Sequence, residues 1–328
     1  MSFDYQTSMP QRKSNVLTSG VVDIKVYGPN LKGLQEQIND ARAGSTLNLF
    51  NNFSTIKDKK IIKISKDMVI DGHGHTIDLA GSSGHDHYFK VTDGSVTFKN
   101  IRFINGYNKD DDTDGAIFFK SLGICTIINC TFENCWAESK AGAIFSIGEL
   151  RIFNSTFLNN RVGDDGGAVY AEGNMIIHGS IFNNNSADDC GGAVDGEGAI
   201  TEIWNCTFDG NAADDDDGGA LWVKGNLFVR DSIFRYNVAG DCAGAIDCEG
   251  SLTEIRNSTL KGNYAHDDGG ALWILGNLFV KDSFFISNVA EDSAGAIDCE
   301  GSKTEIQNST FDGNYAYDDL LISLHYGF

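Results

Sequence analysis

The chain repeats a Gly-Ala pair every 25 to 27 residues. The alanines of these pairs are Ala116, Ala143, Ala168, Ala193, Ala220, Ala245, Ala271 and Ala296. The residue after each alanine is aliphatic, from Ile117 to Ile297. A period of this length is typical of stacked architectures, in which a short unit buries its apolar face only against the next unit.

A second column repeats with the same period at another point of the unit. It holds Phe132, Phe157, Phe182, Phe208, Phe234, Leu260, Phe285 and Phe311. From Phe157 onward an asparagine follows three residues later, giving Asn160, Asn185, Asn211, Asn237, Asn263, Asn288 and Asn314. Stacked asparagines can hydrogen-bond side chain to side chain, which satisfies polar groups that would be costly to bury alone. We therefore interpret these asparagines as structural.

The segments between the glycine and asparagine turns are short and alternate apolar and polar residues, which favours strands over helices. A further inward column runs from Ile127 to Ile306. These patterns predict an all-β chain: a right-handed parallel β-helix, or solenoid, of about ten coils spaced about 4.8 Å apart.

The sequence divides into three predicted parts: a disordered or added leader at residues 1–20, an N-terminal cap at 21–60 and the parallel β-helix at 61–328. Leu31, Leu34, Ile38 and Ala41 have helical spacing, which predicts a short capping helix. Such a cap covers a strand edge that would otherwise pair with other chains. Strands are expected near residues 46–50, 61–64 and 68–70. Residues 1–13 are polar and contain no apolar stretch of a secretory signal.

The charge balance excludes some partners. Lys and Arg total 25 and Asp and Glu total 46, a formal net charge of −21. Nucleic acid is an unfavourable partner for such a chain, because phosphate binding requires the opposite charge. No apolar run approaches the roughly 18 residues of a membrane helix, so direct membrane insertion is not expected. We expect a monomer.

Aromatic and acidic residues alternate at two positions after the inward aliphatic residue. This predicts an outward-facing ligand surface, because exposed aromatic rings stack on sugars and carboxylates accept hydroxyl hydrogen bonds. The candidate contact residues are Tyr170, Asp195, Glu197, Trp222, Asp247, Glu249, Trp273, Asp298 and Glu300. A second face alternates Glu202, Phe228, Glu254, Phe279 and Glu305. The alternative is that both faces only stabilise their sheets through cross-strand pairs.

The turn before each Gly-Ala is acidic, and stacking places its carboxylates about one coil apart. Oxygen-rich clusters suit Ca²⁺, the one cofactor that the sequence suggests. The candidate ligands are Asp188, Asp189, Asp215, Asp216, Asp241, Asp267 and Asp268. Asp is also common in ordinary turns, which is the competing interpretation.

Four histidines form two His-x-His pairs, His73 with His75 and His85 with His87, and leave zinc open as an alternative. Gly72-His73-Gly74 is also similar to a motif of polygalacturonases, but the companion Asn-Thr-Asp and Arg-Ile-Lys motifs are absent.

The eight cysteines do not predict disulfides. Cys248 and Cys299 occupy equivalent positions two coils apart, about 9.6 Å, which exceeds the Cα separation of about 7 Å that a bridge allows.

The pairing of Gly-Gly-Ala-aliphatic with Phe-x-x-Asn, as in 166–169 with 182–185, resembles the repeats of chlamydial polymorphic membrane proteins. In methanogen adhesin-like proteins a segment like residues 34–79 leads into such repeats, so the chain resembles that family more closely. This resemblance implies a β-helix that is exported, lies at the cell surface or outside the cell, and binds a glycan or protein on another cell surface.

Three functions therefore compete. The leading hypothesis is a non-enzymatic, adhesin-like binding module, because a repetitive surface singles out no coil as an active site. The alternatives are a polysaccharide-acting β-helix enzyme of the pectate lyase or polygalacturonase kind, and a passive structural spacer.

Overall fold

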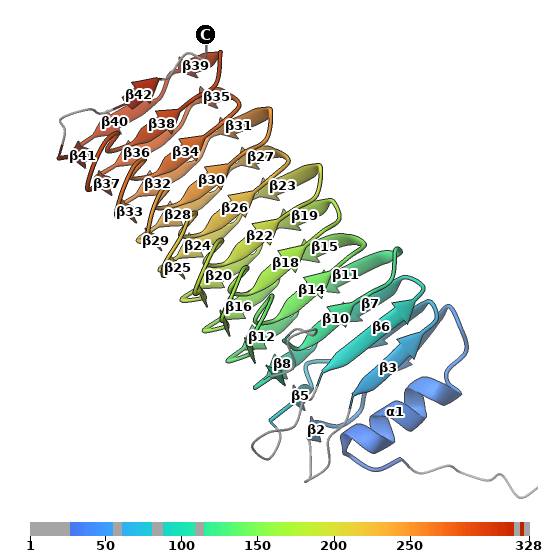
Figure 1. Ribbon diagram of the computed structural model, residues 1–328. Coiled ribbons are helices and arrows are strands. Elements are labelled where there is room, and N and C mark those ends of the chain that lie inside the picture. Colours follow the sequence, from blue (N-terminus) through green and yellow to red (C-terminus); the bar gives the residue numbers. More distant parts are fainter. Residues whose placement is uncertain (1–26, 55–60, 81–87, 109–114, 318–321, 325–328) are drawn as a thin grey trace, which may run out of the picture.

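The computed structural model describes residues 27–54, 61–80, 88–108, 115–317 and 322–324. Its strands stack into one elongated solenoid of about ten coils (Figure 1), with three sheets of 11 strands and one of nine. Every strand pairing is parallel and joins one coil to the next, as in Ile246↔Leu272. The predicted all-β solenoid is confirmed. The predicted leader lies outside the described residues.

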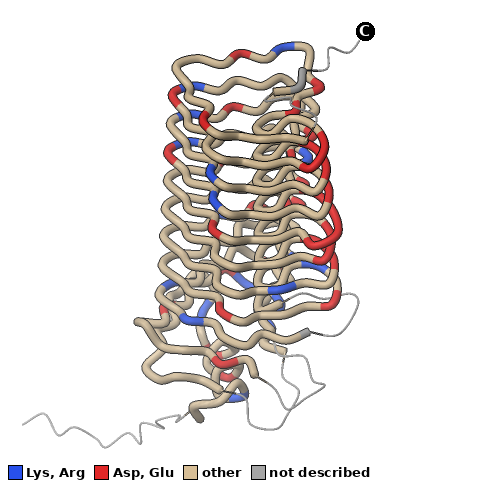
Figure 2. Tube along the Cα trace, turned by 90° about the vertical axis from the view of Figure 1, so that its left-hand side faces the viewer, with Lys and Arg blue, Asp and Glu red and all other residues tan. Residues whose placement is uncertain are grey.

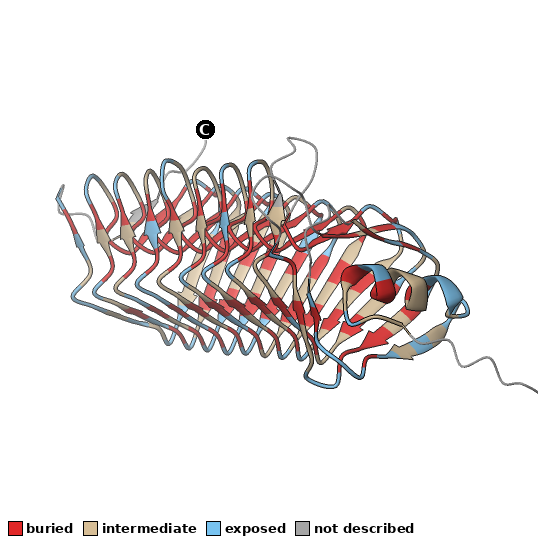
Figure 3. Ribbon diagram, turned by 90° about the horizontal axis from the view of Figure 1, so that it is seen from below, coloured by how far each residue is buried: buried red, intermediate tan, exposed pale blue. Residues whose placement is uncertain are grey.

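The helix α1 (Leu31–Asp40) covers the N-terminal end of the stack (Figure 1). The side chain of Asn30 begins the helix by accepting the backbone N–H of Gly33 at 2.9 Å. Leu34 and Ile38 are fully buried, which shields apolar surface that the open end would expose. Figure 3 shows the helix lying against the end of the stack, with both buried and exposed residues along it. The predicted capping helix is confirmed.

Sheet 1 carries the aliphatic residue that follows each Gly-Ala. Its strands are β3 (Ile62–Ser65), β6 (Phe89–Asp93), β10 (Ile117–Phe119), β14 (Ile144–Ser146), β18 (Val169–Ala171), β22 (Val194–Gly196), β26 (Leu221–Val223), β30 (Ile246–Cys248), β34 (Leu272–Ile274), β38 (Ile297–Cys299) and β42 (Ile322–Leu324). Eight aliphatic residues of the predicted column, Ile117 to Ile297, are fully buried.

Sheet 2 carries the second inward column. Its strands are β1 (Ser45–Asn48), β4 (Met68–Asp71), β7 (Val96–Lys99), β11 (Ile124–Ile128), β15 (Glu149–Phe153), β19 (Met175–His178), β23 (Ile200–Trp204), β27 (Asn226–Arg230), β31 (Leu252–Arg256), β35 (Asn277–Lys281) and β39 (Thr304–Gln307). Inward and outward side chains alternate along each strand, so Ile255 is buried while Arg256 faces solvent.

Sheet 3 carries the phenylalanine column. Its strands are β2 (Phe53–Ser54), β5 (Thr76–Asp78), β8 (Arg102–Ile104), β12 (Thr131–Glu133), β16 (Thr156–Leu158), β20 (Ile181–Asn183), β24 (Thr207–Asp209), β28 (Ile233–Arg235), β32 (Thr259–Lys261), β36 (Phe284–Ile286) and β40 (Thr310–Asp312). Successive rings from Phe157 to Phe234 stack with centroids 4.6 to 4.7 Å apart and planes within 4°.

Sheet 4 consists of two-residue strands that the sequence did not distinguish. They are β9 (Tyr107–Asn108), β13 (Trp136–Ala137), β17 (Arg161–Val162), β21 (Ser186–Ala187), β25 (Ala212–Ala213), β29 (Val238–Ala239), β33 (Tyr264–Ala265), β37 (Val289–Ala290) and β41 (Tyr315–Ala316). The acidic turn of each coil connects sheet 4 to sheet 1, so its position is fixed at one corner of the solenoid.

The asparagine column forms the predicted ladder inside the turn between sheets 3 and 4. Asn185 donates to the Oδ1 of Asn211 at 3.0 Å, and Asn211 donates to that of Asn237 at 2.9 Å. Each of these amides also donates to a phenylalanine carbonyl, as Asn211 does to Phe182 at 3.2 Å. The amides are buried yet satisfied, so they define the register between coils.

Candidate functional site

The predicted contact column on sheet 1 is largely covered. Tyr170, Asp195, Asp247 and Asp298 are only 5, 2, 1 and 3% exposed, so the expectation that these four face solvent is wrong. Each occupies the outward position of its strand, but the acidic turn packs on top. The turn glycine Gly218 shows how close this packing is, because a Cβ there would lie 2.3 Å from the Leu221 carbonyl oxygen, at a φ of 69°.

The other five predicted contact residues are accessible to different degrees. Trp222, Trp273 and Glu197 are half-buried, whereas Glu249 and Glu300 are exposed. Lys224 forms an ion pair with Glu197 at 2.7 Å on the same face. Trp222 and Trp273 thus alternate along sheet 1 with buried aspartates and do not form a continuous exposed row. A ligand role for these five residues stays a prediction.

Tyr170 has a structural explanation. Its hydroxyl accepts a hydrogen bond from Lys140 Nζ at 2.9 Å, and the same ammonium lies 4.1 Å from the centre of the ring. The ring also stacks on Phe145 at 5.4 Å. Burial raises the pKa of the Tyr170 hydroxyl to about 12, so the group is neutral at physiological pH.

The acidic turns align in one row along the solenoid (Figure 2). Three groups bring potential ligand atoms within 4.8 Å of one another: Asp164 with Asp165 and Asp189; Asp217 with Asp241 and Cys242; and Cys242 with Asp267 and Asp268. The predicted Asp189, Asp241, Asp267 and Asp268 belong to these groups.

The remaining predicted ligands lie outside the three groups. Asp188 forms an ion pair with Arg161 at 2.9 Å, and Asp215 is exposed. The sequence prediction also missed Asp164, Asp165, Asp217 and Cys242. Position could have identified the last three, because each directly precedes the Gly-Gly-Ala or Ala-Gly-Ala turn that leads into sheet 1.

Burial makes several of these carboxyl groups weak acids. It raises the pKa of Asp217 to about 7, with further contributions from the neighbouring Asp216 and Asp241. It raises the pKa of Asp164 to about 6, helped by Asp165. The pKa of the fully enclosed Asp247 is raised well above its usual value, by burial and then by the charge of Asp217.

The outer face of sheet 2 is open and carries the second predicted alternation of aromatic and acidic residues. Phe228 pairs in register with Glu254, and Glu254 with Phe279. Next to this column stands a row that sequence analysis did not single out. Its members, each paired with the next, are Trp204, Arg230, Arg256 and Lys281. Strand pairing therefore gathers three cations and an exposed tryptophan on one face of an acidic protein.

A hollow of about 170 Å³ lies between these two columns. Its lining consists of Glu254, Arg256, Phe279, Val280, Lys281, Glu305 and Gln307. Arg256 forms an ion pair with Glu254, and Lys303 lies 4.5 Å from the centre of the Phe279 ring. An aromatic ring flanked by donors and acceptors is a typical site for stacking and hydrogen bonding to a sugar.

The histidine region does not assemble a zinc site within the described residues. His73 and His75 join no group of three potential metal ligands there, and their ring nitrogens contact Asn48 at 2.9 Å and Asn52 at 3.2 Å. The predicted His85 and His87 lie outside the described residues. A hollow of about 530 Å³ adjoins His73, but its asparagines are already paired, with Asn129 donating to Asn100 at 2.7 Å.

All eight cysteines are described and are free thiols. Cys248 and Cys299 are fully buried small side chains of the core. Burial raises the pKa of the Cys248 thiol to about 11, so it is protonated at neutral pH.

The stacked coils, the asparagine ladder and the parallel sheets define a parallel β-helix. Residues 45–228 and 115–285 match the family described as the right-handed β-helix region, and the chain belongs to this family. The predicted right-handedness is thereby confirmed. β-Helices of this kind include enzymes and non-enzymes, so membership alone assigns no activity.

Two further comparisons are distant. The metabotropic glutamate receptor-like protein R of Dictyostelium discoideum is 26% identical over 238 residues, which are 71% of this chain but only 13% of that protein. The solved structure of L. reuteri 53608 SRRP is 18% identical, with a TM-score of 0.45, over 90% of this chain and 98% of that one. In the part of this chain that the structure describes, no helix has the length and hydrophobicity to cross a bilayer.

Proposed function

We propose that this chain is a non-enzymatic binding module that holds an acidic glycan along the outer face of sheet 2. The observation that carries the proposal is the hollow that Phe279, Arg256 and Lys281 line together. The binding surface of the proposal consists of Trp204, Phe228, Arg230, Arg256, Phe279 and Lys281. It replaces the sheet 1 column as the leading candidate.

The chemistry of this surface favours a sugar polymer. Half-buried rings such as Phe228 and Phe279 offer apolar faces for stacking without forming the large contiguous apolar patch of a stable protein interface. Glu305 and Gln307 supply hydrogen-bond acceptors at the edge of the hollow. The stack repeats these groups every two coils, at about 9.6 Å, which suits a ligand that is itself extended and repetitive.

The row of cations favours an acidic sugar. Arg230, Arg256 and Lys281 occur in register on a chain of net charge −21, so they stand out against the surrounding field. Arginine binds carboxylate and sulfate groups in a bidentate manner, which gives directional recognition. Glu254 forms ion pairs with both Arg230 and Arg256, and each arginine side chain is still 49% exposed.

Repetition supports binding over catalysis. The outward residues of sheet 2 recur every two coils, as Glu202, Glu254 and Glu305 do, whereas an active site requires one coil that differs from the others. A position at the cell surface or outside the cell is part of the proposal and rests on the resemblance to adhesin-like repeat proteins.

The test is a glycan array probed with the full chain, containing carboxylated, sulfated and neutral oligosaccharides. We expect binding to acidic members, and at least tenfold weaker affinity for Phe279→Ala and for the double variant Arg256→Gln, Lys281→Gln. Phe284→Ala and Arg235→Gln, which change an exposed ring and an exposed cation on sheet 3, serve as matched controls and should bind normally.

Three outcomes would overturn the proposal. Equal affinity of the sheet 2 variants and the controls would place the ligand elsewhere. Release of reducing or unsaturated sugar ends from acidic polysaccharides would establish the enzymatic alternative. Absence of binding to any glycan would favour a protein partner or a passive spacer.

A further inference from the structure

One position in the acidic turn alternates in chemistry with a period of two coils. It directly precedes the glycine or alanine of each turn and holds Lys140, Asp165, Cys190, Asp217, Cys242, Asp268 and Ser293 in successive coils. Each aspartate accepts the backbone N–H of the next member: Asp165 from Cys190 at 3.3 Å, Asp217 from Cys242 at 2.7 Å and Asp268 from Ser293 at 2.7 Å. The turn therefore forms three equivalent units.

A buried aspartate lies beneath each unit, on the outward side of sheet 1. In the second unit it is Asp247, which is 1% exposed and whose Oδ1 has no hydrogen-bond partner. The carboxylate that acts on it most strongly is Asp217, followed by Glu249 and Asp216. A buried carboxyl group without a partner is costly, and here its charged neighbours are all acidic.

The first unit contains its own cation. Lys140 Nζ lies 3.2 Å from Asp165 Oδ2, and its charge lowers the pKa of the buried Asp195, opposing burial and the nearby Asp165. Lys140 belongs to the coil below Asp165, and the residue in the same place below Asp217 is Cys190, which carries no charge. The Lys140 ammonium thus places a positive charge near the buried Asp195 of the first unit, and the second unit has no basic residue at the equivalent position.

Nearby cations do not fill this role. Lys224, two residues after Trp222, forms an ion pair with Glu197 at 2.7 Å, and its side chain is 57% exposed on the outer surface. Arg161 pairs with Asp188 in the first unit. The charged groups that act on Asp247 in the described structure are thus all acidic, and none of them is a cation.

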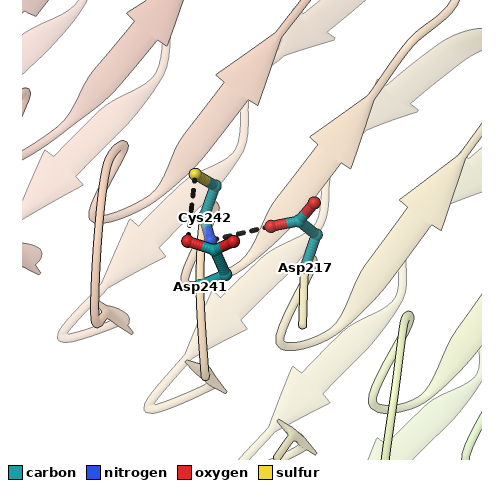
Figure 4. Close-up of side chains that lie close together, drawn as sticks. All are labelled: Asp217, Asp241 and Cys242. Atoms are coloured by element: carbon teal, nitrogen blue, oxygen red, sulfur yellow. Dashed lines mark hydrogen bonds between the residues drawn. The ribbon is translucent and has the colours of Figure 1, made fainter. Parts of the chain in front are cut away.

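We propose that the carboxylates of Asp217 and Asp241 hold a Ca²⁺ ion next to the buried Asp247, and that this ion replaces in the second unit the ammonium group of Lys140 in the first. Carboxylate oxygens of Asp217 and Asp241 lie within 4.8 Å of each other and of the Cys242 sulfur (Figure 4). Oxygen donors of this kind favour Ca²⁺, since the ion accepts irregular geometry and six to eight oxygens, including water and backbone carbonyls.

The thiol of Cys242 is not expected to bind the Ca²⁺ ion. Burial raises its pKa far above the usual range, so it is a protonated group and a poor ligand for a hard cation. A thiophilic ion such as Zn²⁺ would instead depend on this sulfur. Variants at Cys242 therefore separate the two kinds of metal.

Calorimetric titration of the metal-free full chain with Ca²⁺, and terbium luminescence as a second readout, test the proposal. We expect Asp217→Asn and Asp247→Asn each to weaken this binding at least tenfold or to remove one equivalent of Ca²⁺. Cys242→Ser should bind Ca²⁺ normally. Asp215→Asn is the matched control, because it removes one charge from an exposed residue of the same turn.

Asp247→Asn is expected to fold, because an amide has the size of the protonated carboxyl group that it replaces, and circular dichroism checks this. If Asp217→Asn and Asp247→Asn bind Ca²⁺ as tightly as Asp215→Asn does, any loss of affinity comes from net charge alone, and the proposed site is wrong. Binding of Zn²⁺ but not Ca²⁺, with loss in Cys242→Ser, would also overturn it. The glycan-binding assay is independent of these outcomes, because its variants change residues on the outer face of sheet 2 and not in the acidic turn.

Discussion

Asn211 donates a hydrogen bond from its Nδ2 to the Oδ1 of Asn237, 2.9 Å away in the next coil, and both side chains are completely buried. The Oδ1 of Asn211 in turn accepts from the amide and the backbone N–H of Asn185, both at 3.0 Å. One side chain thus links three coils. Its hydrogen bonds fix the axial register in a way that apolar contacts, which have no direction, cannot.

Asn211→Ala should therefore destabilise the solenoid by about 3 kcal/mol, because it leaves buried donors of Asn185 without an acceptor. The measurement is the midpoint of urea unfolding followed by circular dichroism. Asn183→Ala, on the outward side of the same coil pair, is the control and should change the free energy of unfolding by less than about 0.5 kcal/mol. Equal effects of both variants would show that the ladder has no special role.

The phenylalanine stack predicts that the loss of stability at Phe208 depends on how much of the side chain is removed. The Phe208 ring centroid lies 4.7 Å from those of both Phe182 and Phe234. Phe208→Ala should cost about 3–5 kcal/mol, since it opens a cavity in a core that cannot collapse along the axis. Phe208→Leu should cost about 1–2 kcal/mol, because Leu260 fills the same column two coils away. Thermal melting of both variants provides the comparison, and an equal loss in both would contradict the stacking argument.

The ion pair of Lys140 with Asp165 should contribute more than an ordinary surface pair. Its side chains are 35 and 20% exposed, and the same ammonium also contacts Tyr170. Lys140→Met should lower the free energy of unfolding by about 2 kcal/mol, because it leaves acidic groups under the turn without a cation.

Arg161→Met removes the neighbouring pair with Asp188, whose side chains are 56 and 40% exposed, and should cost less than about 1 kcal/mol. Urea unfolding at low salt compares the two variants. A larger loss in Arg161→Met than in Lys140→Met would contradict the role assigned to the turn lysine.

Stability should fall as the pH rises from about 4 to 7 when divalent cations are removed by a chelator. The pKa of Asp217 is about 7 in the folded chain and near 3.8 in its usual state, so between these values the folded chain binds more protons than the unfolded chain. Its stabilising contribution is complete below pH 4 and is lost by pH 7, with a slope of at most about 1.4 kcal/mol per pH unit for one proton.

Asp217→Asn should flatten this slope, whereas Asp215→Asn, at an exposed carboxylate of the same turn, should leave it unchanged. Unfolding curves at intervals between pH 4.5 and 7.5 measure the effect. If the free energy of unfolding of Asp217→Asn changes with pH as steeply as that of the unaltered chain, Asp217 is not the titrating group.

The sequence was sufficient to identify the scaffold because the scaffold depends on periodicity. The aliphatic residues from Ile117 to Ile297, the phenylalanines and the asparagines recur at nearly constant spacing, and each column faces inward as predicted. The capping helix was identified for the same reason, since Leu34 and Ile38 lie on one helical face. The two-residue strands of sheet 4 were missed, because two residues are too few to show a period.

The surface was harder to predict because exposure depends on which segment packs over which strand. Asp195 and Asp247 alternate with aromatic residues as an exposed ladder would, but the acidic turn covers them. The row from Trp204 to Lys281 went unnoticed, since its members differ in type and share only their strand register.

Periodicity in the amino-acid sequence is enough to establish a stacked β-helix with an asparagine ladder, because identical residues at a fixed period can bury their side chains only by lying above one another. The packing of the coils adds the electrostatic effect of Asp217 on the buried Asp247 and the position of Arg256 between Arg230 and Lys281. These relationships could not be predicted, because burial and electrostatics depend on distances between coils, which the identity of single residues does not specify.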